Sequence, residues 1–178
     1  MKAEQPAGPL PNSYWVRRGR FLAGGYPGAG SSAETRLALR GLLLAGVTLF
    51  LDLTEEGEYD LEPYAPILQE DAGLLGRLVE YRRIPIPDGE VPTIEDMVLI
   101  LDAVDAAMAA GRTVYLHCFA GVGRTGMAVG CYLVRHGLEG QVALQEVHRL
   151  RYGRRAWWKR PGPSMSQQAM VRNWSADM

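Results

Sequence analysis

A short apolar segment that passes through a glycine-rich turn into a helical pattern constrains this chain most. Residues 113–118 read TVYLHC, which has the length and composition of a buried strand. After a turn with two glycines, residues 124–136 carry the apolar spacing of a helix, and Gly137 ends it. A strand that leads directly into a helix is typical of parallel sheets, so this segment favours an α/β fold.

The same alternation of strand and helix runs along the rest of the chain. We predict helices over 31–46 and 93–111, each with a hydroxyl residue to cap its start and a glycine at its end. Strands are predicted over 47–53 and 81–86. This order predicts an α/β fold with a central, mostly parallel sheet flanked by helices. Further elements are expected within 14–24 (strand-like), 61–75 (a short helix), 140–152 and 164–175 (helices).

Length and composition fit one globular domain. The chain has 178 residues, of which 47% are hydrophobic, enough for a core and too many for a disordered chain. We expect residues 1–13, which are polar and rich in proline, to form a flexible N-terminal arm, and residues 14–178 to form the domain. The net charge of -1 gives no indication of a nucleic-acid or membrane partner.

Several signals for other classes of protein are missing. The start lacks the apolar core of a secretory signal, and no apolar run approaches the ~20 residues of a membrane helix. Two cysteines, Cys118 and Cys131, cannot form a disulfide framework, and no Cys/His cluster suggests a metal. We therefore expect a cytoplasmic protein that needs no metal or other cofactor.

The turn within 117–126 has the composition of an anion-binding site. It lies at the carboxyl end of a strand, where α/β proteins bind ligands. Two glycines allow the backbone to fold tightly with its N–H groups inward, and the helix that follows contributes its positive N-terminus. Arg124 adds a planar guanidinium that can hold two phosphate oxygens. We call residues 118–124 the cradle loop; its amides come from Phe119, Ala120, Gly121, Val122 and Gly123.

Cys118 lies at the base of the cradle loop. The positive field of the loop and of the helix N-terminus favours the thiolate over the thiol. A thiolate beneath a bound phosphoryl group is a nucleophile directed at phosphorus. The sequence therefore suggests attack of Cys118 on a phosphate ester.

Three other interpretations of the turn compete with this one. A cysteine after a strand is often a small core residue, which is also our expectation for Cys131 in its helix. The glycines 121, 123 and 126 spell the GxGxxG of dinucleotide-binding proteins, but the segment after the following helix is helical, whereas a βαβ unit needs a strand. The GxxxxGK[ST] sequence of a P-loop is absent.

His-Cys, five residues and then Arg-Thr is far more specific than these patterns. It resembles HCxxGxxR[ST], the signature of the cysteine-dependent protein tyrosine phosphatase superfamily, with Cys118, Gly121, Arg124 and Thr125 at the matching positions. The resemblance covers residues 14–175 in element order, although only 117–126 is specific. It implies a phosphatase fold, a catalytic Cys118 and a phosphate-binding Arg124. It further implies that His117 orients the loop and that Thr125 stabilises the departing thiolate.

Asp88 is the candidate general acid. Attack on a phosphate ester requires a proton for the leaving oxygen, and Asp88 follows the predicted strand 81–86 in the sequence PDGEVP. An Asp-Gly pair by itself is a common turn. However, the segment is similar to the PDG…P segment of small dual-specificity phosphatases, which implies that Asp88 is the acid and later the base. Glu90 is the alternative acid.

A further resemblance, to the late RPG…QQ segment of some dual-specificity phosphatases, implies that Gln167 positions the hydrolytic water. Two surface glutamines at the start of a solvated helix are the alternative. Phe119, Ala120 and Val122 stand where phosphoinositide-cleaving relatives often carry lysines, which disfavours inositol lipids. The expected substrates are phosphotyrosine and also phosphoserine or phosphothreonine in proteins, or small phosphoesters.

Two charged segments lie outside these motifs. Residues 149–160 are basic with interleaved aromatics and form either a basic rim beside the cleft or a solvated face. The acidic run 55–62 is predicted to be a solvated loop. Other functions remain open: a non-catalytic phosphate-binding module, a rhodanese-like sulfurtransferase and, least favoured, a nucleotide-binding oxidoreductase.

Overall fold

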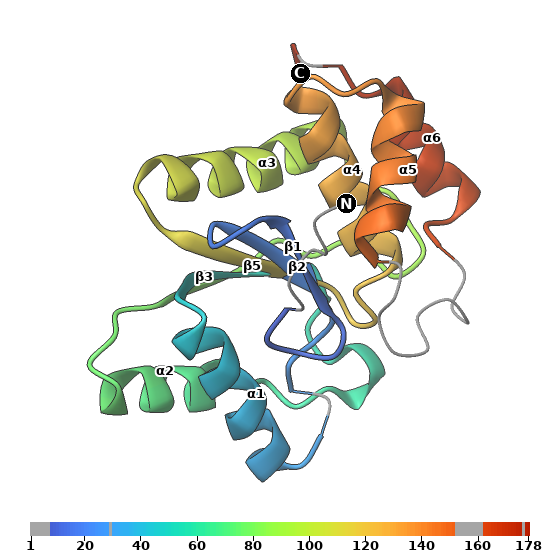
Figure 1. Ribbon diagram of the computed structural model, residues 1–178. Coiled ribbons are helices and arrows are strands. Elements are labelled where there is room, and N and C mark those ends of the chain that lie inside the picture. The colour runs from blue at the N-terminus through green and yellow to red at the C-terminus, as the bar shows by residue number, and fades with distance from the viewer. Residues whose placement is uncertain (1–7, 29, 152–161, 176) are drawn as a thin grey trace.

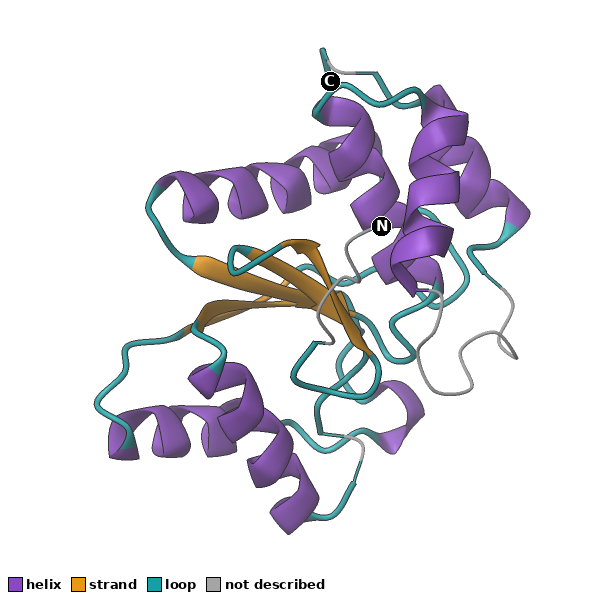
Figure 2. Cartoon of the chain, viewed as in Figure 1, coloured by secondary structure: helices purple, strands orange, loops and turns teal. Residues whose placement is uncertain are grey.

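In a computed structural model, the chain forms a five-stranded sheet between two layers of helices (Figures 1 and 2). The structure describes residues 8–28, 30–151, 162–175 and 177–178. The strands are β1 (Ser13–Arg17), β2 (Phe21–Gly24), β3 (Val47–Asp52), β4 (Glu80–Arg83) and β5 (Thr113–His117). The helices are α1 (Ser32–Leu44), α2 (Ala65–Leu74), α3 (Ile94–Ala109), α4 (Gly123–Arg135), α5 (Gly140–Arg151) and α6 (Met165–Asn173), with a short 3₁₀ turn, η1 (Glu58–Asp60).

The sheet has the strand order β1-β2-β5-β3-β4, and all its pairs except β1 with β2 are parallel. This confirms the predicted α/β fold with a mostly parallel sheet. Because β2, β5, β3 and β4 run in the same direction, the segments that follow them leave the sheet at one edge.

Side chains of the central strands alternate between two cores. On β5, Val114 and Leu116 face the core beneath α3, α4, α5 and α6, whereas Tyr115 faces the core beneath α1 and α2. On β3, Leu51 and Phe50 divide in the same way. Both faces of these strands are buried, which explains their nearly continuous apolar sequences.

The predicted helix starts agree with the capping contacts. Ser31 and Glu34 form a capping box at the start of α1, and Thr93 accepts from the backbone N–H of Asp96 at the start of α3.

The predicted strand 81–86 is too long, because β4 ends at Arg83. Prolines at 85 and 87 have no N–H to donate to a continuous ladder. The N–H groups of Ile84 and Ile86 still donate to β3 and to the residue after it, so the chain keeps its course beside β3.

The expected N-terminal arm falls largely on residues 1–7, outside the described part of the chain. Within the remainder, Leu10 is buried and Ser13 pairs with Gly24 as the first residue of β1. The domain boundary at residue 14 stays a prediction. Among the helices of the described residues, none combines the length and the hydropathy that a membrane span requires.

Candidate active site

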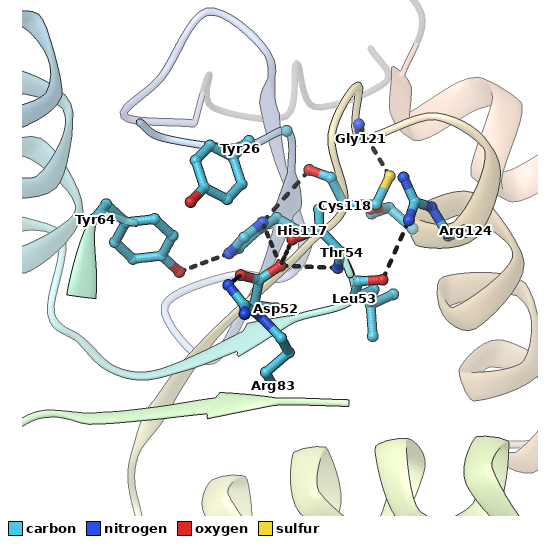
Figure 3. Close-up of polar contacts among 12 residues, drawn as sticks. Tyr26, Asp52, Leu53, Thr54, Tyr64, Arg83, His117, Cys118, Gly121 and Arg124 are labelled. Atoms are coloured by element: carbon cyan, nitrogen blue, oxygen red, sulfur yellow. Dashed lines mark hydrogen bonds and ion pairs between the residues drawn. The ribbon is translucent and has the colours of Figure 1, made fainter. Parts of the chain in front are cut away.

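The candidate site lies where the chain leaves β3, β4 and β5. These strands are parallel neighbours, and their carboxyl ends meet at one edge of the sheet. The cradle loop follows β5, the loop that carries Asp88 follows β4, and the acidic run 55–62 follows β3. Segments far apart in the sequence therefore meet at this edge. Figure 3 shows the end of β3, at Asp52, beside His117 and Cys118 at the end of β5.

The cradle loop turns back on the sulfur of Cys118. The N–H of Gly121 donates to the Sγ atom of Cys118 at 3.2 Å (Figure 3). Gly121 has a φ of 71°, and a Cβ at this position would lie 2.3 Å from the backbone of Gly24. Only glycine permits this approach. Cys118 is 2% exposed. Because α4 begins at Gly123, the last two residues of the cradle loop already belong to the first turn of this helix, where backbone N–H groups have no partner within the helix.

Arg124 is buried and held along one edge of its guanidinium. Nη1 donates to the carbonyl oxygens of Leu53 at 3.3 Å and Ile86 at 2.8 Å. Glu58 accepts from both terminal nitrogens, with its Oε2 at 2.7 Å from Nη1 and its Oε1 at 2.5 Å from Nη2. The side chain of Arg124 is only 1% exposed, and these contacts fix its orientation.

The guanidinium of Arg124 also has a donor that no other described group uses. Its Nε atom is buried and has no hydrogen-bond partner among the residues that the structure describes. Burial alone would lower the pKa of Arg124, but the hydrogen bonds that it donates to Glu58 and its electrostatic interactions with Cys118, Glu58 and Asp88 raise the pKa above its ordinary value. A permanently charged guanidinium with an unused buried donor lies beside the sulfur (Figure 3), which suits an oxyanion.

Asp88 reaches this cluster from the loop after β4. Its Oδ1 lies 3.0 Å from Nη2 of Arg124, and its Oδ2 accepts from the hydroxyl of Tyr59 at 2.5 Å. Its side chain is 51% exposed, so it stands at the mouth of the site. Glu90, the alternative acid, is exposed and contributes its backbone carbonyl, which accepts from Gln167. The structure thus brings the Asp88 carboxylate to Arg124.

His117 lies behind the cradle loop in full burial. Its Nε2 lies 2.7 Å from the hydroxyl of Tyr64, and its Nδ1 lies 3.4 Å from the carbonyl oxygen of Cys118 (Figure 3). Burial lowers the pKa of His117 despite the nearby charge of Asp52, so the neutral imidazole is favoured. With Tyr64 donating to Nε2, the Nδ1 proton is directed at the loop backbone.

Asp52, the last residue of β3, extends this buried network. Its Oδ1 accepts from the N–H and the hydroxyl of Thr54 at 2.9 and 2.7 Å, and its Oδ2 accepts from Tyr81 at 2.7 Å. Burial alone would raise the pKa of Asp52, but His117 and these donors hold it below its ordinary value. Asp52 is therefore a buried carboxylate 3.8 Å from Nδ1 of His117.

Thr125 and Gln167 are both buried beside the cradle loop. The hydroxyl of Thr125 donates to the carbonyl oxygen of Gly24 at 3.2 Å. Gln167 is 2% exposed and forms a capping box with Ser164 at the start of α6. Its side-chain amide also donates to the carbonyl oxygen of Glu90 at 3.1 Å. Its Oε1 would lie 2.8 Å from a Cβ built on Gly123. The alternative of a surface glutamine is therefore wrong for Gln167.

Sequence reasoning missed Glu58 and Tyr59, and its prediction of a solvated loop is wrong for Glu58. The side chain of Glu58 is 7% exposed, because it turns inward to meet Arg124. The many acidic residues of the run 55–62 favoured the prediction that it faces solvent. Its position directly after a buried strand, at the edge where the cradle loop also emerges, was the available signal.

Several other predictions concern cysteine, metals and charge. Cys131 is a core residue in α4, and burial raises the pKa of its thiol to about 12. In the part of the chain that the structure describes, no group of three or more His, Cys, Asp or Glu side chains could hold a metal ion. The basic segment 149–160 lies mostly outside the described residues; within it, Arg149 pairs with Glu146 at 2.5 Å.

Fold and site together define the class of cysteine-dependent tyrosine and dual-specificity phosphatases. The chain belongs to the family described as "Polymorphic toxin system, DSP-PTPase phosphatase" (Tc-R-P), whose model matches residues 25–138. This range runs from the end of β2 to the residues after α4, and it includes the cradle loop and the loop of Asp88.

Related proteins and solved structures agree with this assignment. The 067L protein of Invertebrate iridescent virus 3, whose name classes it as a tyrosine phosphatase, is 32% identical over 118 residues, which cover 64% of this chain and 42% of that protein. A protein of Arabidopsis thaliana, "Phosphatidylinositol 3,4,5-trisphosphate 3-phosphatase and protein-tyrosine-phosphatase PTEN1", is 32% identical over 96 residues, 52% of this chain and 22% of that protein. The chain thus spans less than half the length of these relatives.

Two solved structures show the same fold. Tk-PTP in its active form superposes with a TM-score of 0.70 at 24% identity, covering 94% of this chain and 98% of that one. TpbA of P. aeruginosa in complex with pTyr superposes with a TM-score of 0.66 at 18% identity, covering 99% and 94%.

Proposed function

We propose that this chain hydrolyses phosphate monoesters without a metal, through a phosphocysteine intermediate on Cys118. The observation that carries the proposal is the buried guanidinium of Arg124, which Glu58 fixes beside the sulfur of Cys118 (Figure 3) and whose Nε donor is unused. A fixed cation and inward N–H groups stabilise the equatorial oxygens of a phosphoryl group as it transfers. If the site bound no phosphoryl group or other anion, the buried Nε donor of Arg124 would have no hydrogen-bond partner among the described residues.

In the first step, the Sγ thiolate of Cys118 attacks phosphorus, and the bond from phosphorus to the ester oxygen breaks. Asp88 donates a proton to that oxygen, which leaves as an alcohol or a phenol. Asp88 is suited to this role by position: its half-exposed side chain lies next to the guanidinium that holds the phosphoryl group.

In the second step, water attacks the phosphorus of phosphocysteine, the P–S bond breaks, and inorganic phosphate leaves. The Asp88 carboxylate accepts the proton of the water, and Gln167, buried next to Gly123, orients that water. Thr125 stabilises the departing thiolate. Its hydroxyl donates to the carbonyl oxygen of Gly24, so this role requires an exchange of hydrogen bonds.

The proposed substrates are phosphotyrosine proteins, with phosphoserine and phosphothreonine proteins also accepted. The name of the Arabidopsis relative includes a phosphoinositide activity. Here the side chains of Phe119, Ala120 and Val122 offer no cation for the extra phosphates of such a lipid. Both cysteines are free thiols, and a reducing cytoplasm is the proposed setting for a nucleophilic thiol.

The test is turnover of p-nitrophenyl phosphate and of phosphotyrosine peptides by the purified protein, compared with Cys118→Ser. We expect turnover by the wild type, no turnover by the variant, and retained binding of phosphate analogues because the cradle persists. Phosphate binding without any turnover by the wild type would favour a non-catalytic binding module. Activity with thiosulfate and cyanide in place of phosphate esters would favour a sulfurtransferase.

Asp88→Asn tests the acid separately. Without the proton donor, the rate should fall about 10²- to 10⁴-fold for substrates with poor leaving groups and much less for activated aryl phosphates. Equal losses for both kinds of substrate would contradict the assignment of Asp88 as the acid.

A further inference from the structure

Tyr59 has an unusual backbone for an aromatic residue. It lies in η1 with φ 52° and ψ 31°, and Asp60 beside it has φ 54°. These values fall in the left-handed region, which a bulky L-residue rarely adopts. Such a conformation persists only where the surroundings hold it, and it is common at functional sites. The contacts of Tyr59 should therefore explain why the chain accepts it.

Two contacts place the Tyr59 side chain at the rim of the site. Its hydroxyl donates to Oδ2 of Asp88 at 2.5 Å, and its ring lies against the ring of Phe119, with centroids 4.7 Å apart and a tilt of 39°. Phe119 directly follows Cys118 in the cradle loop. Yet 59% of Tyr59 is exposed, so core packing does not account for its position.

The proposed function also fixes the direction in which a leaving group must depart. If phosphorus lies over Cys118, as the proposed function requires, the ester oxygen must face Asp88 to receive its proton. The group attached to that oxygen then extends outward from Asp88. Because Tyr59 is hydrogen-bonded to Asp88 and its ring contacts that of Phe119, such a leaving group would lie beside the rings of Tyr59 and Phe119.

We propose that Tyr59 is a specificity-determining residue, whose ring forms with Phe119 an aromatic wall that contacts the aryl group of phosphotyrosine. This inference rests on the proposed function and narrows its substrate class to aryl phosphates as the preferred esters. An aromatic ring gains from offset or edge contact with such a wall, whereas the short chain of phosphoserine does not reach it.

The hydroxyl of Tyr59 has a second, separable role. The hydrogen bond to Asp88 raises the pKa of Tyr59, so the group stays a protonated donor in the neutral range. It thereby holds the Asp88 carboxyl in place. The ring serves selection and the hydroxyl serves orientation, and two substitutions separate them: Tyr59→Leu removes the aromatic ring, and Tyr59→Phe removes only the hydroxyl.

The experiment measures binding in a Cys118→Ser background, with a phosphotyrosine peptide and a phosphoserine peptide of otherwise identical sequence. Tyr59→Leu should weaken phosphotyrosine binding about 2- to 10-fold and change phosphoserine binding less than about twofold. Tyr59→Phe should keep the ratio of the two affinities. Leu78→Ala, at a residue that is 94% exposed before β4, is the control and should change neither affinity.

If the ratio of the two peptide affinities is unchanged in Tyr59→Leu, the aromatic wall is refuted. Equal weakening of both peptides would refute it too, provided that the variant unfolds at the wild-type temperature. Should Tyr59→Leu fold poorly, Phe119→Leu removes the other ring and must give the same selective loss. Turnover of p-nitrophenyl phosphate by the protein with Cys118 intact tests the proposed function independently of these affinities. If neither peptide binds the Cys118→Ser protein, the wall and the cradle are both refuted.

Discussion

Arg124 is the residue whose surroundings decide whether the site can work. A guanidinium on a flexible side chain would point in many directions, but here its Nη1 and Nη2 atoms are held by Glu58 and by two backbone carbonyls. The Nε atom remains an unused, buried donor on a guanidinium whose orientation is fixed. Such pre-organisation lowers the cost of ordering the site when the phosphoryl group binds.

Glu58→Gln should therefore impair activity although Glu58 touches no substrate in the proposed mechanism. The amide keeps one acceptor for Arg124 but loses the charge, so the guanidinium is held less firmly. We expect kcat/KM to fall about tenfold and stability to fall by about 1–3 kcal/mol.

Steady-state kinetics and denaturant unfolding check this expectation. Glu56→Gln, an exposed position in the same acidic run, is the matched control and should behave as the wild type. Unchanged kinetics in Glu58→Gln would show that Arg124 needs no carboxylate partner.

The buried His117 makes the stability of the folded protein depend on pH. Burial lowers its pKa in the folded protein, so the unfolded chain, with an ordinary histidine pKa near 6.5, binds more protons below about pH 7. Stability should consequently rise with pH through this window and fall on acidification. Denaturant unfolding between about pH 7.5 and 5 should show this loss, and His117→Gln should reduce it. Parallel curves for the two proteins would contradict the account.

At the scale of elements, the site depends on how closely the cradle loop approaches β2. Gly121→Ala would place a methyl group 2.3 Å from the backbone of Gly24 and would impose a left-handed φ of 71° on alanine. We expect a loss of about 2–5 kcal/mol from overpacking and backbone strain, together with loss of activity.

Gly73→Ala is the matched control, because a Cβ at that position in α2 meets nothing within 4 Å. It should stabilise the protein by about 0.5–1 kcal/mol. Thermal or denaturant unfolding of the two variants separates these outcomes. A Gly121→Ala protein as stable and active as the wild type would refute the tight turn.

The sequence predicts the local elements of this site better than the contacts between residues far apart in the chain. The order of strands and helices, and the turn 117–126, follow from local patterns: apolar runs, capping residues, and glycines next to a cysteine and an arginine. The role of Glu58 could not be predicted in this way, because its partner Arg124 lies 66 residues further along the chain. Only the parallel pairing of β3 with β5 brings the two together.

At the scale of the whole molecule, the parallel sheet gathers chemistry that is scattered along the chain. Asp52 ends β3, Asp88 follows β4 and Cys118 follows β5, and these strands are neighbours in the sheet. Two apolar cores hold the sheet rigid from both faces, so the loops at its carboxyl edge are fixed relative to one another. Loops carried on such a scaffold can be specialised without changing the fold.

The proposed mechanism requires that Cys118 becomes covalently phosphorylated during turnover. The most direct measurement is mass spectrometry of the protein after rapid acid quenching of its reaction with p-nitrophenyl phosphate, followed by mapping of the modified peptide. We expect one added phosphoryl group on Cys118, present only when substrate is supplied and absent in Cys118→Ser. Turnover at full rate in Cys118→Ser, or a phosphoryl group found on another residue, would contradict it.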